Sequence, residues 1–110
     1  MYFVRKKMEI AGSHQLELDY RSKCRNLHGH NWTIIVYCKS NTLNANGMVV
    51  DFTEIKRAVH DKLDHKHLND VVDFNPTAEN IARWVVQQIP HCYRCDVQES
   101  NGNLASYHED

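Results

Sequence analysis

The chain has little proline and glycine and no excess of charge of either sign. It contains 2 Pro and 4 Gly, and 13 Lys plus Arg nearly balance 14 Asp plus Glu, for a formal net charge of -1. Without a basic excess, no surface for a nucleic-acid backbone is expected. No apolar run reaches the length of a membrane span, and the N-terminus lacks the apolar core of a signal peptide. We therefore expect no nucleic-acid or membrane partner and a cytoplasmic location.

Length and composition predict one ordinary globular domain over residues 1–110. A hydrophobic content of 42% and a charged content of 25% are typical of such domains. The 4 cysteines of a cytosolic chain are expected to be free thiols rather than disulfides. The 8 histidines are more unusual, and they give the first compositional indication of chemistry.

Alternating apolar residues predict four strands. Residues 1–16 and 28–38 read as strands, and segments 92–100 and 103–109 read as a hairpin around the turn signal Asn101-Gly102. With two helices between them, the order becomes strand, strand, helix, helix, strand, strand. Segregated strands and helices indicate an α+β fold, in which both helices pack on one face of an antiparallel sheet. The exposed edges of so small a sheet favour an oligomer.

Two amphipathic segments predict the helices. Asp51 reads as the N-cap of a helix over 52–63, and Pro76-Thr77 begins a second helix that Pro90 ends. The apolar positions at helical spacing, which we expect to be buried, are Phe52, Ile55, Val59, Leu63, Ile81, Trp84, Val85 and Ile89.

The stretch CRNLHGH places one thiol and two imidazoles within a few residues. His28 and His30 are two apart on a predicted strand, so both rings project from one face and can reach one ion. Such a pair alone is more often ordinary polar surface or core, by about two to one. His14, which shares the alternation of Met8 and Ile10 on the first strand, is the candidate third ligand. Three histidines leave one zinc position open to water or substrate.

Cys24 lies in the polar loop predicted over 17–27. A thiol beside a divalent cation and histidines is expected to be readily deprotonated, and it can then act as a general base. From the residues alone, this cysteine could be a fourth metal ligand, a nucleophile, a base or an inert loop thiol, and an isolated cysteine is most often the last.

Three further groups are ambiguous. Asp64 next to His65 is typical of a carboxylate that orients an imidazole, but also of a solvated helix end. Glu99 ends a predicted strand; inside a pocket, its two oxygens could accept paired N–H bonds from a flat heterocycle. Cys92 and Cys95 are three apart on a strand and are expected to point to opposite faces, so we give them no metal or redox role.

In order along the chain, His14, CRNLHGHNW, GMVVDF, LDHKHLN, NPTAEN and VQES resemble the 6-pyruvoyl-tetrahydropterin synthase family. The resemblance covers residues from about 10 to 107, most of the chain. The spacing between Cys24 and His28 resembles the 6-carboxytetrahydropterin synthase branch of the queuosine pathway. The family implies the tunnelling (T) fold, in which sheets of several subunits form a barrel with helices outside. It also implies trimers or paired trimers with active sites at subunit interfaces.

The resemblance also implies roles for individual residues. Zn²⁺ would be held by His14, His28 and His30. The proton-transfer residues would be Cys24 as acceptor, His65 with its partner Asp64, and Glu99, which also anchors the pterin; Thr77 and Glu79 would line the pterin pocket. Two positions depart from the family's usual residues: IAGSH stands where a Phe-containing run is more usual, and a serine follows Glu99 where threonine is commoner. These departures affect the expected packing on the substrate side and the expected assembly.

The implied reaction converts 7,8-dihydroneopterin triphosphate to 6-carboxytetrahydropterin, acetaldehyde and triphosphate. The alternatives are 6-pyruvoyl-tetrahydropterin synthesis from the same substrate, a zinc-dependent cyclohydrolase, and a pterin-binding module without catalysis.

Overall fold

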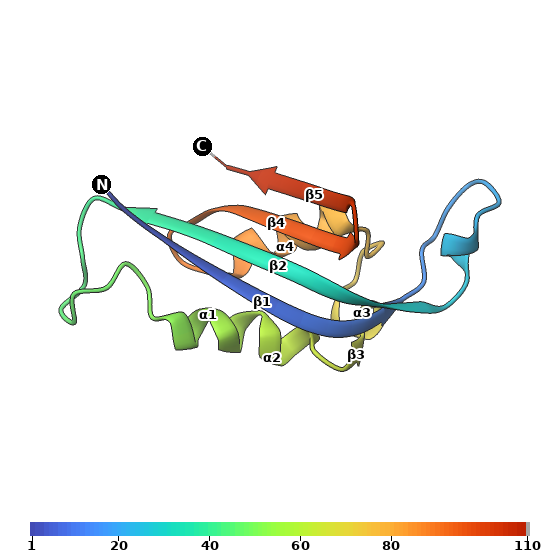
Figure 1. The fold of residues 1–110 in the computed structure, drawn as a ribbon, viewed down its shortest axis with the longest axis horizontal. Helices are drawn as coiled ribbons and strands as arrows, with labels where there is room; N and C mark the ends of the chain where they lie inside the picture. The colour runs from blue at the N-terminus through green and yellow to red at the C-terminus, as the bar shows by residue number, and fades with distance from the viewer. Residues whose placement is uncertain (110) are drawn as a thin grey trace.

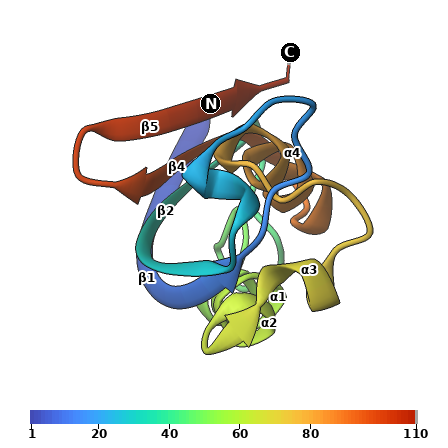
Figure 2. The same cartoon turned by 90° about the vertical axis from the view of Figure 1, so that its right-hand side faces the viewer.

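The computed structural model describes residues 1–109, and two long antiparallel strands run through it (Figure 1). β1 (Tyr2–His14) pairs with β2 (His28–Ser40) along its whole length, so that His14 lies opposite His28. The β-branched and aromatic residues of β2 favour this extended backbone. The loop over 15–27 projects from the end of the sheet at which the two histidines stand (Figures 1 and 2).

Within residues 1–109 the strands form one five-stranded sheet in the order β3-β1-β2-β4-β5. β4 (Cys92–Ser100) pairs antiparallel with β2, and β5 (Asn103–His108) pairs antiparallel with β4. The short β3 (Lys66–His67) pairs parallel with β1. The four antiparallel strands are thus as predicted. The predicted order lacked β3, because a strand of two residues is too short to show an alternating pattern.

β4 carries a bulge where it meets the end of β2. The pairing skips Tyr93, so that Cys92 lies opposite Cys38. An extra residue in a strand disrupts the alternation of its side chains. Cys92 and Cys95 therefore both pack against the core on one face, and the prediction that they point to opposite faces is wrong. All four cysteines are free thiols, as predicted.

The first predicted helix is divided in two. α1 (Phe52–Ala58) begins at Asp51, whose carboxylate accepts a backbone N–H of the first turn at 2.8 Å, as an N-cap should. At Val59 the backbone leaves the helical region, with φ -121° and ψ -66°, and α2 (His60–Leu63) follows.

The second predicted helix is confirmed as α4 (Ala78–Gln88). Thr77 caps it by accepting the N–H of Asn80 at 3.1 Å, and Pro90 follows its end. The short α3 (Leu68–Val71) was not predicted, because it is too brief to give a periodic signal. None of the helices in the described chain is long and apolar enough to cross a membrane.

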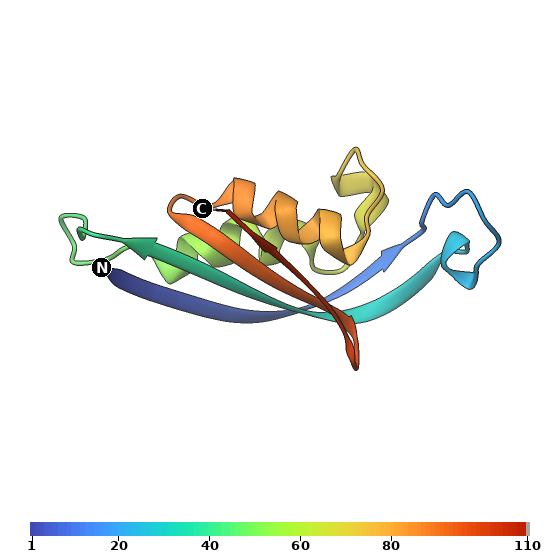
Figure 3. The same ribbon diagram turned by 90° about the horizontal axis from the view of Figure 1, so that it is seen from above.

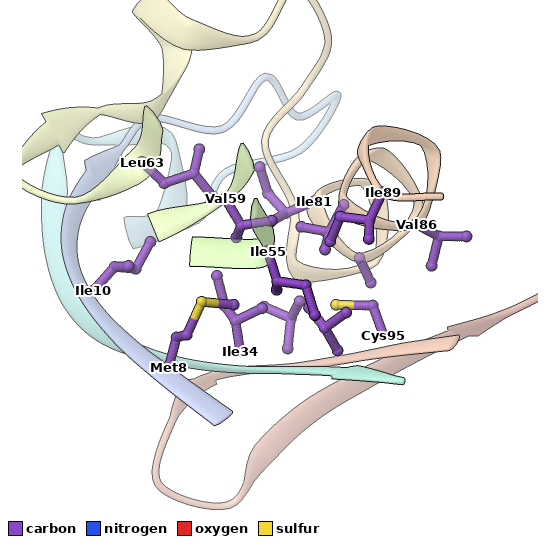
Figure 4. Close-up of a cluster of buried hydrophobic side chains, with 14 of the residues drawn as sticks. Met8, Ile10, Ile34, Ile55, Val59, Leu63, Ile81, Val86, Ile89 and Cys95 are labelled. Carbon is purple, nitrogen blue, oxygen red and sulfur yellow. The ribbon is translucent and has the colours of Figure 1, made fainter. Parts of the chain in front are cut away.

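The helices lie together on one face of the sheet, and the core fills the space between (Figures 3 and 4). Figure 4 shows the buried side chains of the helices, among them Ile55, on one side of the core, and Met8 and Ile34 of the strands on the other. The predicted apolar positions are buried with two exceptions. Phe52 is 50% exposed, since it precedes the turn of α1 that packs on the sheet, and Trp84 is only partly buried. The confirmed buried positions are Ile55, Val59, Leu63, Ile81, Val85 and Ile89.

No element of residues 1–109 covers the other face of the sheet (Figure 3). There Asp96 is almost fully buried and accepts hydrogen bonds from Tyr37 at 2.8 Å, Arg94 at 3.1 Å and Ser106 at 2.6 Å. The guanidinium of Arg94 lies 4.5 Å from the centre of the Tyr37 ring. This network joins β2, β4 and β5 across the uncovered face.

Candidate metal centre

β1 and β2 bring three histidines to one end of the sheet, on the face that the helices cover. Strand register places His14 opposite His28, and His30 opposite Gly12. Alternation puts the three rings on the same side as the core residues further along both strands. The sequence-based placement of the three histidines on one face is therefore seen in the structure.

The three rings and Glu99 form the candidate metal cluster. Each of these four residues offers one ligand atom, and those atoms all lie within 4.8 Å of one another. The ring centres of His14 and His28 are 4.4 Å apart, and those of His28 and His30 are 4.8 Å apart. Tetrahedral zinc with bonds of about 2.0–2.1 Å holds its ligand atoms about 3.3 Å apart. Small side-chain rotations suffice to reach that spacing.

Hydrogen bonds determine which ring nitrogens are free. Nδ1 of His14 lies 2.8 Å from the carbonyl oxygen of Pro76, and Nδ1 of His28 lies 2.7 Å from that of Asn26. A carbonyl oxygen only accepts, so each Nδ1 carries the proton and each Nε2 keeps its lone pair. Histidine ligands of metals are usually oriented in this way.

The cluster also contains unpaired buried nitrogens. Nε2 of His14 and Nε2 of His30 are buried and have no hydrogen-bond partner in the described chain. Nε2 of His30 lies 3.0 Å from a carboxylate oxygen of Glu99, but outside hydrogen-bond geometry. Burial lowers the pKa of His14 despite its bond to Pro76, so the ring is neutral. A buried polar atom without a partner costs about 1–3 kcal/mol, and a bound cation removes that cost. The donor set therefore fits a zinc ion.

Trp32 and Gly12 support the cluster and could not be recognised from spacing. The buried indole of Trp32 lies 4.8 Å from the ring of His14, and its N–H donates to the Gly12 carbonyl at 3.1 Å. A Cβ at Gly12 would lie 3.3 Å from Leu68 and 3.4 Å from the Trp32 nitrogen. The small residue in IAGSH thus allows this packing. The backbone carbonyls of Pro76 and Asn26, which orient His14 and His28, could not be predicted either, because every residue has such a carbonyl whatever its side chain.

Cys24 lies in the loop that joins the two histidine-bearing strand ends. It is the middle residue of a one-turn 3-10 helix, η1 (Lys23–Arg25). Its N–H donates to Ser22 at 3.2 Å, and its carbonyl accepts the N–H of Leu16 at 3.0 Å. The thiol is partly buried and is not a member of the four-residue cluster. Of the alternatives left open for this thiol, the geometry disfavours the metal ligand.

Asp64 and His65 lie at the edge of the sheet, outside the cluster. A carboxylate oxygen of Asp64 accepts the Ala11 N–H at 2.9 Å, which lowers the pKa of Asp64. The backbone N–H of His65 donates back to the Ala11 carbonyl at 2.7 Å. The His65 ring lies 3.5 Å from Asp64 but is 83% exposed, over a hollow of about 510 Å³ that also borders Asn31. Neither residue belongs to the four-residue cluster, although His30 borders the same hollow as His65.

The residues expected to bind a pterin are partly brought together. Glu99 and Glu79 line one cavity of about 300 Å³, together with Asn103 of β5. Thr77 is instead engaged as the cap of α4 through Asn80. Glu99 thus borders both the histidine cluster and this cavity, which sequence spacing did not indicate.

Comparison with known proteins agrees with this arrangement. The family model of 6-pyruvoyl tetrahydropterin synthase matches residues 3–110. The chain belongs to this family. The resemblance seen in the ordered motifs is therefore confirmed.

Some of its relatives are named 6-carboxytetrahydropterin synthases and others 6-pyruvoyl tetrahydrobiopterin synthases. A 6-carboxy-5,6,7,8-tetrahydropterin synthase of Synechocystis sp. is 33% identical, over 97% of this chain and 93% of the relative. The Bacillus subtilis protein of the same name is 27% identical, over 93% of this chain and 82% of the relative. A 6-pyruvoyl tetrahydrobiopterin synthase of Dictyostelium discoideum is 34% identical, over 89% of each chain.

The fold is also that of a solved family structure. The structure of Caenorhabditis elegans 6-pyruvoyl tetrahydropterin synthase superposes with a TM-score of 0.77 at 22% identity, over 99% of this chain and 96% of that one. The predicted α+β T-fold is confirmed. The closed barrel of several sheets stays a prediction.

Proposed function

We propose that the chain is a cytoplasmic, zinc-dependent lyase, a 6-carboxy-5,6,7,8-tetrahydropterin synthase of queuosine biosynthesis. Its substrate would be 7,8-dihydroneopterin triphosphate, and its products 6-carboxytetrahydropterin, acetaldehyde and triphosphate. The observation that carries the proposal is the convergence of three histidines, two of them oriented by backbone carbonyls, beside a carboxylate at the rim of a cavity. Relatives with this name, similar over nearly the whole chain, support it.

His14, His28 and His30 would hold the ion through their Nε2 atoms, which the carbonyl bonds of His14 and His28 leave free. When bound, zinc supplies Lewis-acid stabilisation to the side-chain hydroxyls of the pterin and to charge that develops beside them. We assign Glu99 to the pterin ring and not to the zinc ion, which leaves the fourth coordination position of the ion to the substrate.

Cys24 would accept protons from the substrate side chain. Its loop is anchored at Leu16, two residues after His14, and its partly buried thiol stands outside the ligand set. A thiol held beside a metal but not bound to it is free to act as a general base.

Asp64 and His65 would form the second proton-transfer group. The Ala11 N–H lowers the pKa of Asp64, so the carboxylate stays charged and orients the His65 ring. Since the ring is 83% exposed, we propose that it serves the metal centre of a neighbouring chain in a homo-oligomer, a trimer or hexamer. The uncovered sheet face and the edge at β5 are consistent with such an assembly.

The cavity of about 300 Å³ would take the pterin ring. Glu99 is the assigned anchor, because two carboxylate oxygens can accept paired N–H groups of a flat heterocycle. Glu79 and Thr77 would complete the lining from α4; the Thr77 hydroxyl accepts the Asn80 N–H and still has its own proton to donate.

Product analysis tests the proposal. Zinc-loaded protein is incubated with 7,8-dihydroneopterin triphosphate, acetaldehyde is assayed, and the pterin is identified by mass spectrometry. The metal-free protein is the control. We expect acetaldehyde and a 6-carboxy product in equal amounts, with zinc only.

The second candidate is 6-pyruvoyl-tetrahydropterin synthesis, which the Dictyostelium relative favours at 34% identity. That activity gives a 6-pyruvoyl product and no acetaldehyde in the same assay. An untouched substrate would leave the pterin-binding module and the cyclohydrolase, which would act on a purine ring that this substrate lacks.

A further inference from the structure

Two thiols face each other at the end of the sheet remote from the metal centre. Cys38 near the end of β2 lies opposite Cys92 at the start of β4. His30 is eight residues earlier on β2, which at about 3.3 Å per residue is about 26 Å away. The proposed function uses neither thiol, and the bulge at Tyr93 is what brings Cys92 to this position.

The backbone bonds identify the kind of strand pair. The N–H of Lys39 donates to the carbonyl of His91 at 3.0 Å, so these neighbours are joined by backbone hydrogen bonding. The next pair along the ladder, Cys38 and Cys92, is therefore the non-hydrogen-bonded kind, in which facing Cα atoms are about 4.5 Å apart and side chains are closest. Disulfides span Cα distances of about 4.4–6.8 Å.

The two thiols differ in access and acidity. Cys38 is fully buried, whereas Cys92 is partly exposed. A hydrogen bond from the Cys38 thiol lowers the pKa of Cys92 and raises that of Cys38. Cys92 is thus the thiol that meets a reagent from solution, and Cys38 needs to reach only Cys92.

We propose that Cys38 and Cys92 form a reversible cross-strand disulfide in exchange with small disulfides of the glutathione type. The Cys92 thiolate attacks one sulfur of the small disulfide, whose S–S bond breaks and releases one thiolate. Cys38 then attacks the Cys92 sulfur, and its proton goes to the second departing thiolate. Two protein thiols are oxidised, and one small disulfide is reduced to two thiols.

The bond would tie β2 to β4 and close the loop that contains all four helices, from α1 to α4. Closing a loop of this size stabilises a domain through the unfolded state, which predicts a rise in Tm of about 10 °C. Because the metal centre is distant, zinc content is expected to be the same in both forms.

Tryptic mapping tests the proposal directly. Cleavage after lysine and arginine puts the four cysteines in four different peptides: 24–25, 26–39, 84–94 and 95–110. The folded protein is equilibrated with oxidised glutathione, free thiols are blocked by alkylation, and the digest is analysed without reduction. We expect peptide 26–39 linked to peptide 84–94, with the loss of two hydrogen masses, and complete reversal by dithiothreitol.

The matched variants are Cys92→Ser, which removes the exposed partner, and Cys95→Ala, which removes a buried thiol on the same strand. The link and the rise in Tm are expected to disappear in the first and to persist in the second. A protein whose Cys38 stays alkylatable after unfolding, or a link between peptides 84–94 and 95–110, would overturn the proposal. Neither result bears on the product assay, since both thiols lie outside the metal centre.

Discussion

The histidine cluster and the Asp64–His65 pair differ in how far one chain completes them. The three cluster histidines are held within a few ångströms of one another, and His14 is fully buried. His65, in contrast, is 83% exposed at the sheet edge. Both groups are nevertheless attached to β1, since Ala11 binds Asp64 and His65 through its backbone. The difference indicates that the first group is complete in one chain and that the second is presented outward.

The backbone of the pair supports this interpretation. His65 adopts φ 57°, a left-handed conformation that costs a non-glycine residue about 1–3 kcal/mol. The surrounding contacts that hold it there are the bonds of Asp64 and His65 to Ala11. A left-handed residue is also common just after a helix end, so the support for the proposed role comes from the anchoring of this exposed residue to β1.

Removing a metal ligand is expected to have the largest effect. His28→Ala should lose bound zinc and at least about 10³-fold in kcat/KM, because the Lewis acid is lost with the ligand. Metal content after dialysis and the product assay measure the two losses. His108→Ala, an exposed histidine on β5, is the matched control and should retain both. A His28 variant with full zinc content would remove this residue from the ligand set.

Removing the proposed base should separate metal binding from turnover. Cys24→Ala is expected to bind zinc normally and to lose about 10²-fold or more in kcat. Cys92→Ser, assayed under reducing conditions, provides the thiol control. If Cys24→Ala loses its zinc, Cys24 is a metal ligand. If its kcat is unchanged, Cys24 is not the general base.

A substitution of Glu99 tests whether this carboxylate binds the pterin or the metal ion. Glu99→Gln should keep zinc and raise KM about 10–100-fold, since one acceptor of a paired, charge-assisted bond becomes a donor. Metal content and KM are measured on the same preparation, with Glu54→Gln of α1 as the surface control. If zinc affinity falls and KM does not change, Glu99 belongs to the ligand set instead.

The smallest effect is expected for a change of Asp96, which lies outside both the histidine cluster and the Asp64–His65 pair. Burial alone would raise the pKa of Asp96, but the bonds from Arg94, Ser106 and Tyr37 outweigh it and lower the pKa below its ordinary value. The unfolded chain therefore binds a proton first as pH falls, so this stabilisation is full above the ordinary pKa and is lost as pH falls through the folded value.

Asp96→Asn should thus cost about 1–3 kcal/mol in free energy of unfolding near neutral pH and flatten the acid limb of stability. Chemical denaturation as a function of pH measures both, with Asp73→Asn as the exposed control. An unchanged acid limb would show that this network does not contribute.

Much of the candidate metal centre could be predicted, because alternation and strand register follow from local sequence. His14, His28 and His30 lie where a period of two places them. The break at Val59 and the bulge at Tyr93 have no such signal, since tertiary packing decides them. For the same reason spacing missed the proximity of Glu99 to His30, which lie on adjacent strands of the sheet but far apart in the chain.

The most direct test of the account is complementation between two inactive chains. Cys24→Ala and His65→Ala, each inactive alone, are coexpressed with different tags, and mixed assemblies are purified by both tags in succession. If each site combines the metal centre of one chain with the His65 of its neighbour, every doubly tagged trimer has one restored site in three, and the product assay should recover about a third of wild-type activity; randomly mixed hexamers should recover about a quarter. Mixed assemblies as inactive as their parents would show that each site is built within one chain, which would contradict the account.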